Sequence, residues 1–74
     1  MQDIINETLM HNCKFYVVLD LVDKRKSAEG DTLVVLVKRM STGELHTAEL
    51  TGHEDTLAIA RIQSAQETAE VLAH

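Results

Sequence analysis

The sequence has no proline and no tryptophan, one cysteine, three glycines and only two aromatic residues, Phe15 and Tyr16, among its 74 residues. The single cysteine, Cys13, excludes an intrachain disulfide, and so few glycines argue against a glycine-rich phosphate-binding loop. The core must therefore consist of Val, Leu, Ile and Ala. Because a chain this short buries only about 60% of its unfolded surface, oligomerisation is the stabilising aid that this composition leaves open.

The chain also has no long apolar run and no cluster of basic residues. No apolar stretch approaches the roughly 18 residues of a membrane span, and no basic region precedes an apolar segment at the start. Twelve acids against seven bases give a net charge of −5, whereas nucleic-acid binding depends on clustered Lys and Arg. We expect one soluble cytoplasmic domain over residues 1–74, with no membrane or direct nucleic-acid partner.

The patterns that are present predict an α+β fold: a three-stranded antiparallel meander with a long C-terminal helix packed on one face. Asp3 as an N-cap and the spacing of Ile5 and Leu9 favour a short helix within the first twelve residues. Alternating segments rich in β-branched residues predict three strands, over residues 13–22, 32–40 and 44–50. The predicted order is αβββα.

The charged segment over residues 23–31 is typical of a solvated hairpin loop. An alternative is that its bases contact a phosphate, but the neighbouring acids weaken their field. The bases are Lys24, Arg25 and Lys26, and the acids are Asp23, Glu29 and Asp31.

A tight turn is predicted between the second and third strands, where Gly43 can take a positive φ. A two-residue turn would place Met40 opposite Leu45 and Val37 opposite Ala48. A three-residue turn would shift this register, and the sequence leaves both open.

A long helix is predicted from Thr51 to the end of the chain, because Thr51 and Glu54 have the spacing of a capping box. Neither proline nor glycine interrupts residues 56–74, which include five alanines. Small and apolar residues recur at helical spacing and predict the stripe that packs on the sheet. The stripe contains Ala58, Ile62, Ala65, Ala69 and Leu72.

The order of helix, three strands and helix is similar to that of double-stranded-RNA-binding domains. In that family a Lys-rich cluster stands at the start of the last helix. Here the corresponding segment, residues 52–56, contains Glu54 and Asp55 and is acidic. The resemblance covers topology alone, and RNA binding is not implied.

Both faces of the predicted sheet carry apolar residues. The predicted core face contains Phe15, Val17, Leu19, Leu21, Leu33, Val35 and Val37. One helix covers only one face, so the N-terminal helix, a second copy or a partner protein must cover the other; we expect a homodimer. The predicted partner-binding residues are Tyr16, Val18, Leu36, Met40, Leu45, Ile59, Glu67 and Glu70.

Residues that bear chemistry form no recognisable constellation. His11 and Cys13 lack a second ligand pair at zinc spacing, and Cys13 is expected to be a small buried hydrophobe on a strand. We expect no catalytic, metal or cofactor residues. The favoured hypothesis is a non-enzymatic protein-interaction module. The alternative is an acidic inhibitor or nucleic-acid-mimicking decoy of phage or mobile-element type, acting through Glu67 and Glu70.

Overall fold

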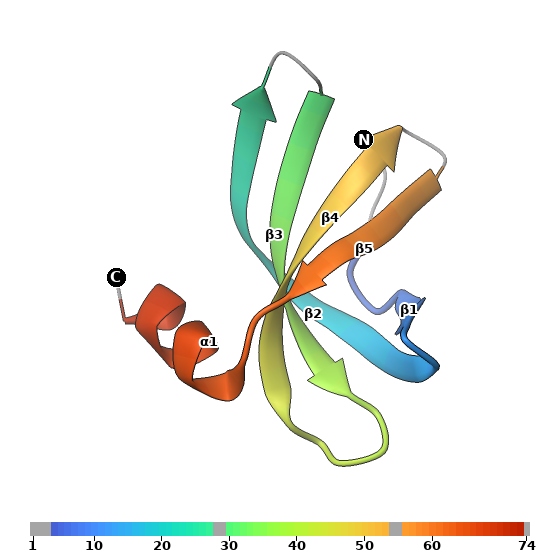
Figure 1. Ribbon diagram of the computed structural model, residues 1–74, viewed down its shortest axis with the longest axis vertical. Coiled ribbons are helices and arrows are strands. Elements are labelled where there is room, and N and C mark those ends of the chain that lie inside the picture. Colours follow the sequence, from blue (N-terminus) through green and yellow to red (C-terminus); the bar gives the residue numbers. More distant parts are fainter. Residues whose placement is uncertain (1–3, 28–29, 54–55, 74) are drawn as a thin grey trace.

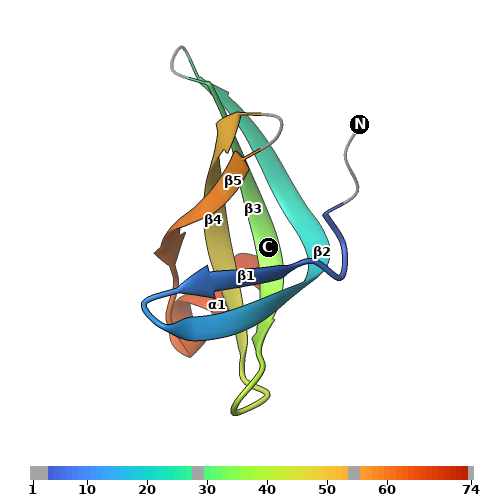
Figure 2. The same cartoon turned by 90° about the vertical axis from the view of Figure 1, so that its right-hand side faces the viewer.

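The computed structural model describes residues 4–27, 30–53 and 56–73, which form a five-stranded antiparallel sheet and one short helix (Figure 1). The elements are β1 (Thr8–His11), β2 (Lys14–Ser27), β3 (Gly30–Arg39), β4 (Leu45–His53), β5 (Thr56–Ile62) and α1 (Ala65–Leu72). The strands pair in chain order, β1-β2-β3-β4-β5. β1 also contacts β5, so the sheet curls almost into a barrel (Figure 2).

The curl depends on the long strand β2, which pairs with both β1 and β3. Its register against β3 shifts at Leu19 and again at Val22, so each shift adds one residue to β2. Such bulges bend a strand and increase its twist. After each shift an aspartate accepts the next backbone N–H, from Leu21 to Asp20 at 2.9 Å and from Lys24 to Asp23 at 2.8 Å.

The core lies inside the curled sheet and is almost entirely aliphatic, which confirms the prediction from composition. Its buried residues are Ile4, Tyr16, Val18, Val35, Val37, Ala48, Leu50 and Ile59. They come from four strands and the N-terminal segment. A sheet that closes on itself covers its own inner face, so no helix is needed there.

The prediction of a long C-terminal helix was wrong. Residues 45–53 and 56–62 are the paired strands β4 and β5, and the helix is confined to Ala65–Leu72. Thr51 lies in β4, and Glu54 is outside the described residues. The exposed edge of β4 offers residues 56–62 a ladder of hydrogen bonds, which outweighs their helix propensity.

The helix starts instead at Ser64, whose hydroxyl accepts the backbone N–H of Glu67 at 3.2 Å. The Ser64 hydroxyl also lies 3.4 Å from the Glu67 carboxylate. Ser64 and Glu67 have the same spacing as Thr51 and Glu54. The prediction that Thr51 and Glu54 start the helix was therefore wrong, and Ser64 is the N-cap residue.

Where β5 has ended, Gln63 and helix α1 supply the hydrogen-bond partners for the edge of β4. The Thr47 N–H donates to the hydroxyl of Thr68 at 2.7 Å, and the Gln63 N–H donates to the Thr47 carbonyl at 2.9 Å. The Thr47 hydroxyl also donates to the Gln63 side chain. Thr47 and Thr68 are both buried, so these bonds are shielded from water.

The predicted N-terminal helix is absent from the described residues. Residues 8–11 form β1 instead, Asn6 has a φ of 71°, and Asp3 lies outside the described residues. The predicted αβββα order is therefore wrong, and the likeness to double-stranded-RNA-binding domains does not hold.

The predicted faces of β2 were also wrong. Tyr16 and Val18 are buried in the core, whereas Phe15, Leu19 and Leu21 are exposed. On β3, Val35 and Val37 do face the core as predicted. Apolar residues occupy both faces of β2, so alternation alone does not identify the inner one, and the bulges change the alternation further along.

Five residues, 40–44, connect β3 to β4, instead of the two- or three-residue turn that was predicted. The Arg39 N–H donates to the Glu44 carbonyl at 2.8 Å, and the register pairs Lys38 with Leu45 and Val35 with Ala48. Gly43 has a φ of 76°, as expected. The predicted loop over residues 23–31 is mostly strand, because β2 extends to Ser27 and β3 begins at Gly30.

The hairpin between β1 and β2 turns on Asn12 and Cys13, with φ values of 50° and 63°. Cys13 is exposed in this turn, so the prediction of a buried cysteine was wrong. Two positive φ values are typical of a type I′ turn, which favours Asn-Gly. Because a non-glycine residue in this region costs roughly 1 kcal/mol, Cys13→Gly is expected to raise the free energy of unfolding by about that amount.

Urea denaturation of the wild type and Cys13→Gly measures this difference. The control is Gly43→Ala, at the other tight turn, which should lower the free energy of unfolding because alanine is strained at a φ of 76°. If Cys13→Gly is no more stable than the wild type, the assigned turn conformation is incorrect.

Candidate interaction surface

The outer face of the sheet, opposite the core, carries a set of residues that neighbour one another across β1, β2, β3 and the start of β4. One row follows the pairings Thr8–Val17–Lys38–Leu45. In the next row Met10 pairs with Phe15, whose carbonyl accepts the Met40 N–H at 3.0 Å. We call the following residues the outer patch: Met10, Phe15, Val17, Lys38, Met40 and Leu45.

Four large apolar side chains of the outer patch are open to solvent. Met10 is 65% exposed, Met40 59%, Phe15 54% and Leu45 46%. Single exposed apolar residues are ordinary, but a contiguous group is typical of an interaction site. The two methionines are unbranched and polarizable, so this surface can adapt to the shape of a partner.

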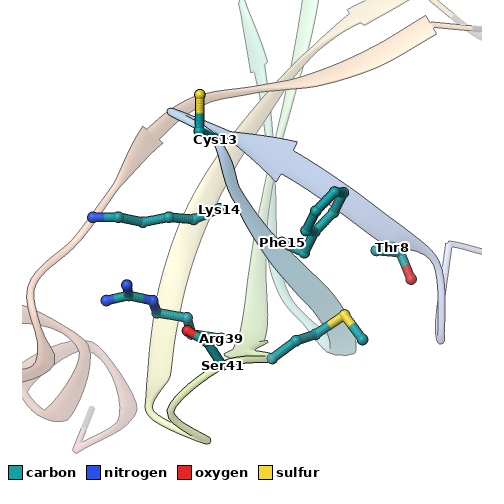
Figure 3. Close-up of a pocket in the computed structure, with 7 residues that line it drawn as sticks. Thr8, Cys13, Lys14, Phe15, Arg39 and Ser41 are labelled. Atoms are coloured by element: carbon teal, nitrogen blue, oxygen red, sulfur yellow. The ribbon is translucent and has the colours of Figure 1, made fainter.

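A hollow of about 540 Å³, open to solvent, adjoins the outer patch. It is lined by Thr8, Cys13, Lys14, Phe15, Arg39, Met40 and Ser41. Figure 3 shows the side chains of Lys14 and Arg39 extending in one direction, away from Phe15 and Thr8. The outer patch therefore combines protruding apolar groups with a recess, and basic groups stand beside that recess.

The bases at this end of the sheet have no acidic partner among the residues that the structure describes. Within the described residues, Lys14, Lys38 and Arg39 form no ion pair, and the Arg39 Nε is buried without a hydrogen-bond partner. The Lys38 stem lies over the β3–β4 turn, with its Cε 3.8 Å from the position of a β-carbon built on Gly43. The Lys and Arg ion pairs elsewhere are Lys24–Asp31, Arg25–Asp23, Arg61–Glu49 and Arg61–Glu67. The Glu44 carboxylate, beside Leu45, lies 3.5 Å from the His46 Nε2.

Charge is divided unevenly along the chain. Residues 1–39 contain six bases and six acids, whereas residues 40–74 contain six acids and a single base, Arg61. The whole net charge of −5 therefore belongs to the half that contains β4, β5 and α1. Arg61 lies between Glu67 at 3.0 Å and Glu49 at 3.9 Å, so it offsets part of this acidity.

The eight residues predicted to bind a partner fall into three environments. Met40 and Leu45 lie in the outer patch, and the half-buried Leu36 is in the next row along β3. Tyr16, Val18 and Ile59 are in the core, where no partner reaches them in this fold. Glu67 and Glu70 are exposed on α1, within the acidic half.

Four members of the outer patch were not identified from the sequence. Met10 was assigned to a helix, Phe15 and Val17 were assigned to the core face, and Lys38 was not among the predicted partner-binding residues. Phe15 and Tyr16 are neighbours on β2 and face opposite sides of the sheet, so only one of them can be in the core. Because a tyrosine hydroxyl does not exclude the residue from a core, Tyr16 could have been placed inside and Phe15 outside.

The described residues contain no group of three His, Cys, Asp or Glu side chains that could hold a metal ion. His46 has a structural role: its Nδ1 lies 2.9 Å from the Gln63 carbonyl, and its ring meets Tyr16 edge to face at 6.3 Å. Across residues 4–27, 30–53 and 56–73, no helix is long and apolar enough to cross a membrane.

The fold and the outer patch can be set against known proteins. No family model matches the sequence, and no significant match is found among curated proteins or solved structures. Function is therefore inferred from the outer patch and the distribution of charge.

Proposed function

We propose that this protein is a non-enzymatic protein-interaction module that binds a partner protein through the outer patch. The observation that carries the proposal is the adjacency of Met10, Phe15 and Met40 on three neighbouring segments, each with more than half of its surface exposed. Covering these groups on binding removes apolar surface from water, which is the main driving force of most protein association.

Self-association is the alternative use of the same surface. A homodimer was expected because one helix cannot cover both faces of an open sheet, but the curled sheet buries its own inner face. The exposed large apolar residues are then those of the outer patch together with Leu19, Leu21 and Leu72. A two-fold dimer centred on the outer patch would bring the Lys38 side chains of both copies together, and like charges at an interface are unfavourable. A different protein is therefore the favoured partner.

The test compares proteins captured from a host lysate by the wild type, by Phe15→Ser/Met40→Ser and by Leu72→Ser. Leu72 is 49% exposed on α1 and serves as the matched apolar control. The wild type and Leu72→Ser are expected to retain the same proteins, and the double variant to lose them. Sedimentation velocity at several concentrations should show a monomer. Capture that is unchanged by the double variant would contradict the proposal.

An acidic inhibitor or decoy is the second candidate, supported by the concentration of net charge in β4, β5 and α1. Glu70 is the better residue for its test, because the Glu67 carboxylate also contacts the N-cap residue Ser64 and pairs with Arg61. For a decoy, Glu70→Lys should weaken binding to a basic partner at least several-fold, and added salt should weaken it steeply. Binding that is insensitive to both changes excludes this candidate.

A further inference from the structure

We infer that the outer patch takes a short peptide segment of another protein in which a carboxylate is flanked by apolar side chains, with the carboxylate seated on Lys38. This inference rests on the proposed function and specifies the chemistry of the partner. Lys38 is placed for this role by its pairings with Val17 on one side and Leu45 on the other. A cation thus stands within an otherwise apolar surface.

The charge of Lys38 is available to a ligand. Within the described residues it forms no ion pair, although the acids Asp23, Asp31, Glu49 and Glu67 all pair with other bases. Its stem lies beside the β3–β4 turn at Gly43. Lys14 and Arg39, beside the adjoining hollow, add to the positive potential at this end of the molecule.

Because Lys38 is surrounded by apolar residues, the charge of the partner segment determines how well that segment can bind. A wholly apolar segment that covered Phe15 and Leu45 would remove water from Lys38 without replacing its hydrogen bonds, which is costly. A carboxylate satisfies the ammonium group by a charge-assisted hydrogen bond, and this bond is strengthened where water is excluded. A second copy of this patch would present another lysine instead. An acidic, apolar segment therefore fits best.

The dimensions of the surface favour a segment over a large folded interface. The outer patch consists of two rows of residues, and the adjoining hollow of about 540 Å³ has the size of a site for a few side chains. An apolar side chain of the segment fits into the hollow beside Phe15 and Met40, while its carboxylate reaches Lys38 in the next row.

The experiment is selection from a displayed library of random dodecapeptides on the immobilised full-length protein. Four proteins are compared: the wild type, Lys38→Glu, Phe15→Ser/Met40→Ser, and Lys26→Glu as a control with the same charge change at the other end of β2. Circular dichroism first establishes that each variant is folded. Enriched peptides are then synthesised, and their affinities are measured by fluorescence anisotropy.

The wild type and Lys26→Glu are expected to enrich peptides with Asp or Glu beside aromatic or aliphatic residues. Lys38→Glu should lose affinity for those peptides at least tenfold and enrich peptides with Lys or Arg in the same apolar frame. Apolar peptides enriched without a charge preference overturn the inference but leave the proposed function intact. If peptides bind the Phe15→Ser/Met40→Ser variant as well as the wild type, the outer patch is not the binding surface and the proposed function fails too.

Discussion

Replacing Val18 with alanine is expected to lower the free energy of unfolding by about 2 to 3 kcal/mol, whereas replacing the larger Phe15 with alanine should cost less than about 1 kcal/mol. Val18 is fully buried between strands, and its truncation leaves a cavity in an aliphatic core. Phe15 is 54% exposed, so much of its ring is already in water. Truncation of the smaller side chain, Val18, is therefore expected to cost more stability than truncation of the larger one, Phe15.

Urea denaturation followed by circular dichroism measures both variants, and Leu19→Ala serves as a further surface control on the same strand. The arrangement predicted from the sequence, with Phe15 in the core and Val18 on the other face, gives the reverse inequality. A larger loss for Phe15→Ala than for Val18→Ala would therefore show that β2 presents its other face to the core.

Replacing Thr68 with valine is expected to lower the free energy of unfolding by about 2 kcal/mol. The substitution conserves shape but removes the hydroxyl that accepts the Thr47 N–H at 2.7 Å. Both residues are buried, and β5 ends before it could supply a carbonyl to this part of β4. The Thr47 N–H would lose its acceptor, and an unpaired buried donor costs about 1 to 3 kcal/mol.

Two further variants separate the hydroxyl from other effects. Thr68→Ser keeps the acceptor and should recover most of the lost stability. Thr51→Val makes the same change at an exposed position of β4, where valine suits a strand, and should be nearly neutral. Equal stability of Thr68→Val and Thr68→Ser would mean that the hydroxyl does not complete the edge of β4.

The same contrast between buried and exposed positions makes the binding experiments practicable. Phe15, Lys38 and Met40 are all exposed, so their substitution can alter recognition without removing core volume. Tyr16 and Val18, also predicted to bind a partner, would be poor choices because they lie in the core, so their substitution would lower stability and obscure an effect on binding.

Part of the candidate surface could be predicted from the sequence. Met40 and Leu45 were identified because they are apolar residues on the predicted second face of the sheet. Met10 was not, because the first twelve residues were predicted to form a helix. Phe15 was not, because the face of β2 depends on which side of the sheet closes inward. Lys38 could not be recognised as part of the surface from the sequence, because its position between Val17 and Leu45 is set by strand pairing.

The amino-acid sequence by itself determined the aliphatic character of the core, the strands around residues 13–22, 32–40 and 44–50, and the positive φ of Gly43. These features depend on composition or on neighbours a few residues away. The tertiary structure alone decided that residues 56–62 are a strand, that the helix begins after Ser64 and that the outer patch is exposed. Residues 56–62 have good helix propensity, but the open edge of β4 supplies hydrogen bonds and the core accepts Ile59. Each of these outcomes is set by contacts between segments far apart in the chain, which no local pattern contains.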